Sequence, residues 1–318
     1  MNTQSKEKGV SIVVPFLNES EGIEIFCKTL DEYQKKVSFP VELVFVDDGS
    51  TDDTISKIEA FRFNNINDAT IVRFSKNFGS HAALRAGFQI AVYDTCTWLG
   101  ADLQEPIEFI EIAYDKIQEG YDAVYVDKKS VGTSIGERFF SKTYSWLMRK
   151  YAVSTYSSGG TSVIVFNKKI KDYMNANVEN NSSVMLQIMD AGFKYCTIHL
   201  DFHERSIGKS KWTLKKKIKL FIDSFVSFSF MPIRLVSIIG VMLFFVGLII
   251  GVIAIINKLT NPSVPIGYST IASLLALGFG VMNISLGIIA EYLWRAYDAA
   301  RGRPVFIVSE TINVKKSE

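Results

Sequence analysis

Two long stretches without a charged residue constrain this chain more than any other feature of its sequence. They cover residues 235–256 and 268–289. At a rise of about 1.5 Å per residue, a helix of either stretch is long enough to cross the hydrocarbon core of a bilayer. A buried hairpin inside a soluble domain is the alternative, but two uncharged runs of this length are unusual in such a core. The pattern predicts two transmembrane helices.

Basic residues gather outside these two stretches and set the expected orientation. One flank carries Lys215, Lys216, Lys217, Lys219 and Arg234, and the other carries Arg295, Arg301 and Arg303. The connection at 257–267 has a single charge. By the positive-inside rule both flanks are cytoplasmic. Residues 1–9 are polar and lack the apolar core of a signal peptide. We therefore expect a multi-pass protein of the inner (cell) membrane with both termini and its large domain in the cytoplasm.

The residues before the apolar stretches alternate short apolar runs with helical patterns. We expect strands at 10–14, 41–46, 70–74, 96–99 and 123–126, and helices at 19–33, 54–61, 81–92 and 106–118. Strands and helices that alternate at this spacing indicate an α/β domain with a doubly wound, mainly parallel sheet. Ligands of such sheets bind beyond the carboxyl ends of the strands.

Two further helical patterns, at 138–151 and 211–225, combine basic and aromatic residues. Helices of this composition suit the headgroup region of an anionic membrane. Packing on the helix's own domain with a solvated basic face is the alternative. The expected organisation is a cytoplasmic α/β domain at 1–210, a juxtamembrane amphipathic helix at 211–232, a transmembrane hairpin at 233–292 and a cytoplasmic tail at 293–318. A net charge of +2 argues against a nucleic-acid partner.

Acidic residues follow the second expected strand directly. Asp47 and Asp48 precede Gly49 at the point where that strand ends. Two carboxylates there can accept hydrogen bonds from a base edge and ribose hydroxyls, and glycine lets the backbone approach a ligand closely. A tight turn with an aspartate cap on the next helix is the simpler interpretation, and Asp52 or Asp53 fits that role.

Asp102 and Gln104 follow the fourth expected strand. A carboxylate and an amide oxygen are hard ligands that suit Mg²⁺ or Mn²⁺ beside a diphosphate. An aspartate before a helix that begins at a proline is also a common cap. His81 follows Gly79 at the start of a helix, where contact with a phosphate and a capping role are both open.

Several segments recur in a characteristic order. They are PFLNE at 15–19, DDGS at 47–50, NFG at 77–79, DLQ at 102–104 with a proline at 106, RSIGKSKW at 205–212, EYLWR at 291–295 and RP at 303–304. Together they resemble the polyprenyl-phosphate glycosyltransferases, the dolichol-phosphate-mannose-synthase-like branch of the family-2 glycosyltransferases. More closely, they resemble the bactoprenol glucosyltransferases with a two-span anchor. The resemblance covers nearly the whole chain.

The resemblance implies a GT-A (Rossmann-like) fold and inverting, metal-dependent transfer of a sugar from a nucleotide-sugar, UDP-sugar preferred, to undecaprenyl phosphate. Such a product serves the cell envelope, for example lipopolysaccharide. The implied site has four parts: Pro15, Asn18, Glu19, Asp47, Asp48, Gly49 and Asp102 for the nucleotide-sugar; Asp102 and Gln104 for Mg²⁺ or Mn²⁺; Arg205, Ser210 and Lys211 for the acceptor phosphate; and Asp102 and Arg205 in catalysis.

The sequence departs from the family pattern at two positions. Gly100 stands where the family usually has the first aspartate of Asp-x-Asp, and Thr161 stands where Gly-Asp-Phe-Arg usually supplies an acidic residue. Three explanations are open. Another residue takes the place of the missing acidic residues, the acceptor phosphate reacts without them, or the activity is weak.

These departures favour one alternative function, a catalytically impaired relative that acts as a membrane scaffold for a flippase or a second transferase. A polysaccharide synthase is a further alternative, but such an enzyme needs several more spans and a Gln-x-x-Arg-Trp motif. A flippase is one candidate partner. A second copy of the chain is another, because glycines at 240, 247 and 251 permit helix packing between protomers.

Overall fold

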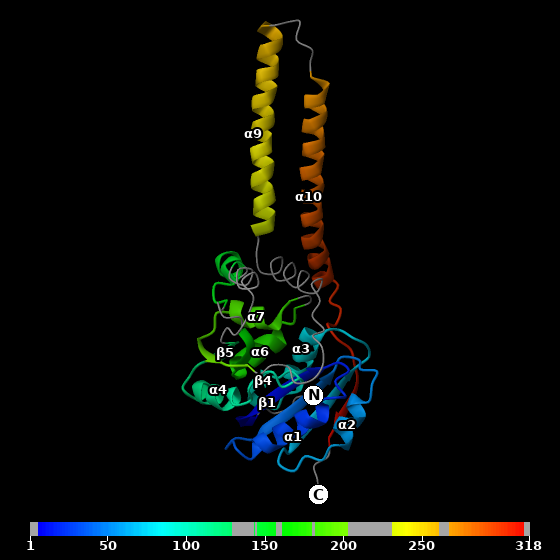
Figure 1. Cartoon of the computed structure of the whole chain (residues 1–318), viewed down its shortest axis with the longest axis vertical. Helices are drawn as coiled ribbons and strands as arrows, with labels where there is room; N and C mark the ends of the chain where they lie inside the picture. The colour runs from blue at the N-terminus through cyan, green and yellow to red at the C-terminus, as the bar shows by residue number, and fades with distance from the viewer. Residues whose placement is uncertain are drawn as a thin grey trace. The chain divides into compact units, whose positions relative to one another are not determined.

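The structure is a computed structural model that describes residues 6–128, 143, 145–156, 161–179, 182–202, 231–260 and 267–314. The chain divides into two compact units (Figure 1). One unit comprises Met1–Ser224 and Pro304–Glu318, and the other comprises Phe225–Arg303. The end of the chain therefore returns to the unit in which the chain began.

The first unit is built on a sheet whose central strands are largely buried and rich in β-branched and aromatic residues. They are β1 (Lys6–Phe16), β2 (Val41–Asp47), β3 (Asp68–Phe74) and β4 (Tyr93–Trp98). Every residue of β2 is buried. A strand with this pattern is covered by helices on both faces of its sheet.

Three helices connect these strands: α1 (Ile23–Gln34), α2 (Thr54–Ala60) and α3 (Ser80–Ile90). α1 packs against α2, and α3 packs against β1 and β2. Gly87 of α3 lies so close to Val13 of β1 that a Cβ there would overlap the valine side chain. Right-handed crossovers place α3, which returns the chain from β3 to β4, on the face opposite α1 and α2. The doubly wound arrangement expected from the sequence is confirmed.

The second half of this unit adds further strands and helices: α4 (Phe109–Gln118), β5 (Ala123–Lys128), β6 (Thr161–Phe166), α6 (Lys168–Ala176), α7 (Val184–Asp190), β7 (Tyr195–Leu200) and β8 (Val308–Asn313). The strand order is β7-β5-β6-β4-β1-β2-β3-β8. β1, β2, β3 and β4 run parallel, and so do β5 and β7. β6 is antiparallel to β4 and β5, and β8 is antiparallel to β3.

Aromatic side chains fill the core beneath the central strands. The ring of Phe45 meets those of Phe16, Phe26 and Phe63 at centroid distances of 6.5, 6.3 and 6.5 Å. All four are at least 96% buried. Burial of such rings is a large part of the free energy that holds a sheet of this kind together.

The second unit contains two long helices, α9 (Met231–Thr260) and α10 (Tyr268–Ala300). Among the described residues, Leu277–Ala300 is the one helical stretch long and apolar enough to cross a membrane, and Arg234–Gly247 is a shorter apolar stretch. Large apolar side chains such as Phe279 and Ile284 are more than half exposed. The expectation of a membrane span is supported for one helix. The second span stays a prediction.

The structure differs from the sequence-based expectations in several elements. α1 begins at Ile23 and α4 at Phe109, later than expected, because 19–22 and 106–108 form turns. β6, β7 and β8 were not expected, and β8 comes from residues that we assigned to a tail. The helix expected at 211–225 lies outside the described residues. In the described part of the other amphipathic pattern, Ser145 and Met148 are buried while Trp146 is half exposed.

Candidate active site

The carboxyl ends of the central strands bring four loops to one edge of the sheet. Phe16 at the end of β1 pairs with Asp47 at the end of β2, and Asp47 pairs with Arg73 of β3. The backbone N–H of Leu99, just after β4, donates to the carbonyl of Val13 in β1 (3.0 Å). The residues predicted for the nucleotide and the metal therefore share the edge where doubly wound sheets bind ligands.

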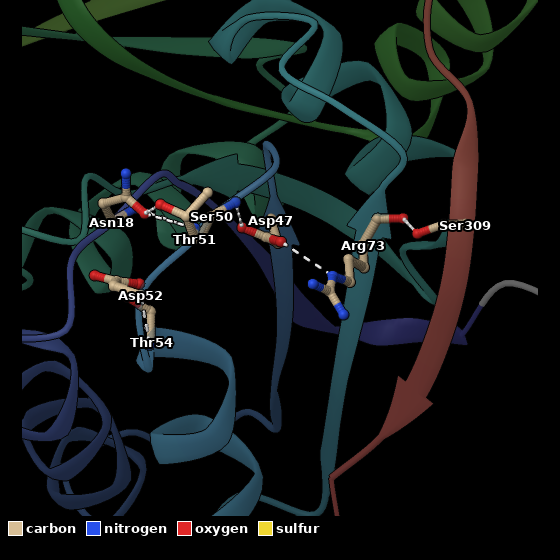
Figure 2. A network of polar contacts seen from close by, with 8 residues as sticks. All are labelled: Asn18, Asp47, Ser50, Thr51, Asp52, Thr54, Arg73 and Ser309. Atoms are coloured by element: carbon tan, nitrogen blue, oxygen red, sulfur yellow. Dashed lines mark hydrogen bonds and ion pairs between the residues drawn. The ribbon is translucent and has the colours of Figure 1, made fainter.

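The loop after β1 is held to the loop after β2 by reciprocal hydrogen bonds (Figure 2). The N–H of Asn18 donates to Ser50 Oγ (2.9 Å), and the N–H of Thr51 donates to Asn18 Oδ1 (2.8 Å). Asn18 has a positive φ of 53°, which asparagine tolerates better than most residues. The side chain predicted to contact a nucleotide thus also shapes its own loop.

Glu19 and Pro15 flank this contact. The N–H of Glu19 donates to Thr54 Oγ1 (3.0 Å). Pro15 is half-buried and pairs with Val46, next to the last pair of the β1–β2 ladder. A proline is tolerated at a strand end because it removes little from the ladder. Both predicted residues therefore lie at the strand ends that meet.

Asp52 supports the start of α2. Its Oδ1 accepts hydrogen bonds from the N–H (3.1 Å) and Oγ1 (2.6 Å) of Thr54, and its Oδ2 accepts the N–H of Ser20 (3.3 Å). Burial raises the pKa of Asp52, but these hydrogen bonds outweigh it and hold the pKa below its usual value. The N-cap position of α2 is Asp53, whose side chain makes no capping hydrogen bond, so Asp52 supports the turn before the helix and is not its N-cap.

Asp48 ties the loop after β3 to the loop after β2. Its Oδ1 accepts the N–H of Phe78 (2.6 Å), and its Oδ2 accepts the N–H of Gly79 (3.0 Å). Its own N–H donates to the carbonyl of Phe16 (3.0 Å). Burial of the carboxyl group raises its pKa despite these donors. The carboxylate is a structural link between the loops as well as a candidate ligand contact.

Asp47 is completely buried behind this loop. Its Oδ1 accepts the N–H of Ser50 (2.8 Å), and its Oδ2 lies 3.7 Å from Arg73 Nε (Figure 2). Gly49 has a φ of 85°, and a Cβ there would lie 3.0 Å from the backbone of Asn77. Glycine is therefore required where this loop meets the loop after β3.

The loop after β4 presents oxygen ligands over a glycine. A Cβ built on Gly100 would lie 2.9 Å from Asp102 Oδ1 and 3.5 Å from Glu105 Oε2. Leu103 has a positive φ of 51°, and its N–H donates to the carbonyl of Gly100 (3.3 Å). Sequence reasoning passed over Glu105. Its position directly after Gln104 is the signal that could have found it.

No group of three His, Cys, Asp or Glu side chains gathers within the part of the chain that the structure describes. The acidic pair of Asp102 and Glu105, with the amide of Gln104 in the same loop, still offers carboxylate and amide oxygens. These are the ligands that Mg²⁺ and Mn²⁺ prefer. The loop therefore contains oxygen atoms of the kind that bind a divalent cation.

Thr161, where the family usually has an acidic residue, contacts an aspartate on the neighbouring strand. Its Oγ1 donates to Asp127 Oδ1 (2.7 Å), and the two residues are paired in the β5–β6 ladder. Asp127 is 98% buried. A carboxylate thus stands beside position 161 although the sequence at that position has none.

The face where α3 meets α6 and α7 buries a second polar group of residues. His81 Nδ1 accepts the N–H of Val184 (3.4 Å), so this histidine supports the start of α7 rather than that of its own helix. Burial, and then the charge of Arg85, lower the pKa of His81 to about 4. The imidazole is therefore neutral near pH 7 and offers a phosphate no positive charge.

Arg85 lies one turn further along α3 and is 98% buried. Its Nη1 and Nη2 have no hydrogen-bond partner among the described residues. Burial lowers the pKa of the guanidinium, against the attraction of Glu179. Sequence reasoning missed this residue because its spacing in the helix resembles that of a surface arginine.

Arg205, Ser210 and Lys211, predicted for the acceptor phosphate, lie outside the described residues. Their placement stays a prediction.

The family model of Glycosyl transferase family 2 matches residues 11–185. A prophage bactoprenol glucosyl transferase homolog of Escherichia coli is 31% identical over 305 residues, which cover 94% of this chain and 98% of that protein. The undecaprenyl-phosphate 4-deoxy-4-formamido-L-arabinose transferase of Proteus mirabilis is 27% identical over 318 residues, 99% and 98% of the two chains. The glycosyltransferase YkcC of Bacillus subtilis is 32% identical over 316 residues, 96% and 94%.

Proposed function

The chain belongs to glycosyl transferase family 2, and from this premise we propose that it transfers a sugar from a nucleotide-sugar to a polyprenyl phosphate, undecaprenyl phosphate in particular. The observation that carries the proposal is the gathering of the loops after β1, β2, β3 and β4 at one edge of the sheet. The relatives that match nearly the full length of the chain include enzymes named for undecaprenyl phosphate and bactoprenol.

The nucleotide-sugar, with UDP as the preferred carrier, occupies the edge formed by Pro15, Asn18, Glu19, Asp48 and Gly49 in this proposal. These residues belong to loops that hydrogen bonds already hold in place. A site that is organised before its ligand arrives loses less entropy on binding. Asp47 acts from behind the loop, since it is completely buried.

Asp102 and Gln104 would hold Mg²⁺ or Mn²⁺, with Glu105 beside them. The fit rests on two carboxylate oxygens beside Gly100. Asp102 Oδ1 and Glu105 Oε2 lie 2.9 Å and 3.5 Å from the position that a Cβ on Gly100 would occupy. Charge on the leaving nucleoside diphosphate would be neutralised by a divalent cation held in this loop. Glu105 thereby places a carboxylate where Gly100 has none.

The acceptor phosphate is assigned to Arg205, Ser210 and Lys211 by their position in the motif. Arginine and lysine form charge-assisted hydrogen bonds with phosphate oxygens. A lipid phosphate is already an anion, so it needs no strong base to attack the anomeric carbon, and attack from the face opposite the leaving group inverts that carbon. Positioning and charge neutralisation, in which Asp102 and Arg205 take part, then carry most of the rate.

The membrane topology belongs to the same proposal. Two spans within 233–292 would place both termini and the sheet domain in the cytoplasm, where nucleotide-sugars are made, with 211–232 as an amphipathic helix at the headgroups. The exposed apolar side chains of Leu277–Ala300 support a span at that helix.

The test is a donor screen on the full chain in lipid nanodiscs that contain undecaprenyl phosphate. UDP- and GDP-sugars are supplied with Mn²⁺ or with EDTA, and the lipid product is identified by its mass. We expect one donor to give a glycosyl-phospholipid only with the metal. Metal-independent transfer would contradict the role of the loop after β4, and no transfer with any donor would contradict the whole proposal.

A scaffold without activity is the second candidate, and the specific observation in its favour is the pair of departures at Gly100 and Thr161. The contacts of Glu105 and Asp127 weigh against it, because each brings a carboxylate to one of these positions. Nucleotide binding without lipid glycosylation in the same screen would favour the scaffold.

A further inference from the structure

The C-terminal strand β8 completes the sheet on the side of the nucleotide loops. It pairs antiparallel with β3, and Glu310 lies opposite Arg73. Arg73 lies opposite Asp47 on the other side. Side chains of directly paired residues share one face of a sheet. A row of alternating charge therefore runs from Asp47 through Arg73 to the C-terminal strand.

Arg73 joins β8 to the buried carboxylate of Asp47 (Figure 2). Its Nε lies 3.7 Å from Asp47 Oδ2, and its carbonyl oxygen accepts a hydrogen bond from Ser309 Oγ (3.0 Å). The N–H of Ser75, two residues later, donates to the carbonyl of Ile307 (3.1 Å). The C-terminal segment thus contacts the end of β3 twice, once at Arg73 and once just after the strand at Ser75.

A second set of contacts leads from the same segment to Asp48. The ring of Phe306 stacks on that of Phe74 (5.2 Å between centroids, 14° between planes). Phe74 meets Phe78 edge to face at 5.6 Å. The N–H of Phe78 donates to Asp48 Oδ1 at 2.6 Å. Residues 306–310 are therefore linked to Asp47 through Arg73, and to Asp48 through Phe74 and Phe78. All three linking residues lie at or just after the end of β3.

We propose that residues 306–310 set the geometry of the donor site, with Arg73 as the positioning residue that orients Asp47. The inference rests on the proposed binding of a nucleotide at these loops and adds the C-terminal segment to the site.

The physical reason is the burial of Asp47. A buried carboxylate that loses its cation keeps its desolvation cost without compensation. Asp47 Oδ2 has no hydrogen bond in the described structure, so the nearby guanidinium is its principal partner. Without Arg73 the carboxylate would rotate away from its present position, and it would release the N–H of Ser50 that shapes the loop.

The experiment measures binding of UDP and of GDP to the full chain by isothermal titration calorimetry, with Mn²⁺ present. Arg73→Gln removes the charge and keeps most of the side chain, whereas Arg73→Lys restores a cation. We expect Arg73→Gln to raise the Kd of the preferred nucleotide about tenfold, and Arg73→Lys to stay within about threefold of the parent. In the transfer assay, the KM for the donor rises while kcat and the KM for the lipid stay close to the parent values.

Variants of the C-terminal segment complete the test. Ser309→Ala removes the hydroxyl that meets Arg73, and Phe306→Leu removes the stacked ring; each raises the Kd about threefold. Thr311→Val is the matched control on the same strand, because Thr311 is exposed and pairs with Val72 rather than Arg73. It binds nucleotide as the parent does. Should Arg73→Gln fail to fold, Ser309→Ala carries the test.

The outcomes separate this inference from the function on which it rests. If Asp47→Asn and Asp48→Asn weaken nucleotide binding but Arg73→Gln and Ser309→Ala do not, the positioning role is overturned and the proposed function stands. If the aspartate variants bind as the parent does, or the parent binds neither nucleotide, both are overturned. If Arg73→Gln lowered kcat and the melting temperature as well as raising the donor KM, Arg73 would have a purely structural role and the inference would be overturned.

Discussion

The nucleotide-side loops and the face between α3 and α7 both bury charged or polar side chains, but they satisfy them differently. In the loops, the buried carboxylate of Asp48 and the exposed carboxylate of Asp52 accept backbone N–H groups, although Oδ2 of the buried Asp47 accepts no hydrogen bond in the described structure. Between α3 and α7, Arg85 Nη1 and Nη2, Ser182 Oγ and Gln187 Oε1 are buried without a hydrogen-bond partner in the described structure. Burial of a polar group is costly unless a partner compensates it.

The difference indicates two kinds of constraint on the sequence. Where loops from separate strands must meet, side chains that accept backbone N–H groups fix the loops before a ligand binds. Where helices pack, the guanidinium of Arg85, whose Nη1 and Nη2 have no hydrogen bond in the described structure, lowers stability and leaves the loops unchanged. Variants of the first region should therefore change activity, and variants of the second should change stability.

Asp102→Asn gives the largest expected effect. It keeps the shape of the side chain but removes the charge that a divalent cation needs, so transfer to undecaprenyl phosphate should fall about 100-fold or more. The melting temperature should stay within about 2 °C, since the change is isosteric. Asp115→Asn on the exposed side of α4 is the matched control. Parental turnover by Asp102→Asn would refute the assignment of the metal to this loop.

The pH dependence of stability tests His81. Its pKa is about 4 in the folded protein, whereas the ordinary value for a histidine, which we take for the unfolded chain, is 6.5. Well above pH 6.5 the imidazole is neutral in both states, and the residue contributes nothing. As the pH falls from 6.5 towards 4, the unfolded chain takes up a proton that the folded chain does not, so stability falls by at most about 1.4 kcal/mol per pH unit.

Urea unfolding at pH 7 and pH 5 measures this effect. The parent should lose about 2 kcal/mol more than His81→Gln between the two values. Identical losses for the parent and His81→Gln would show that the pKa of His81 is the same in the folded and unfolded chains, and would remove the contrast between the two regions.

Arg85→Met should stabilise the protein. Replacement of a buried guanidinium whose Nη1 and Nη2 have no hydrogen bond in the described structure by an apolar side chain of similar length should raise the free energy of unfolding by about 1–2 kcal/mol. Transfer activity should not change. Arg62→Met is the control, since the Arg62 side chain is exposed and donates to the carbonyl of Glu59. A loss of stability with Arg85→Met would mean that the guanidinium has a strong partner in the folded protein.

Gly49→Ala and Gly120→Ala form a matched pair with a small expected difference. Both glycines have a positive φ, 85° and 93°, so alanine strains both. Only the Cβ at position 49 meets backbone atoms at 3.0 Å; at position 120 nothing lies within 4 Å. Thermal unfolding should show a larger loss for Gly49→Ala, by about 1 kcal/mol. Equal losses would mean that the loops after β2 and β3 are not tightly packed.

The sequence was sufficient to predict the central half of the sheet and the edge that carries the loops. The apolar, β-branched run that ends at Asp47 indicates a buried strand, and Asp102 follows the strand expected at 96–99; both strands are confirmed. β8 could not be found in this way. Its residues, VSETIN, are almost all exposed in the sheet, so they lack the apolar pattern of a central strand.

The contacts between loops could not be predicted from the sequence either. Residue spacing does not show that Glu105 lies over Gly100, that Asp127 meets Thr161, or that Arg73 lies beside Asp47. Each of these contacts joins residues whose neighbourhood depends on a loop conformation or on strand order. Patterns along one strand or helix cannot contain that information.

The pairing of β8 with β3 has a consequence for synthesis of the protein. Ser309 and its partner Arg73 are 236 residues apart in the chain. At about 5–20 residues per second, translation leaves the edge of β3 without its neighbour for roughly 10–50 s. An unpaired strand edge is a template for association with other chains. Chaperone protection of the nascent chain is most valuable in that interval, which ends only after the apolar helices have left the ribosome.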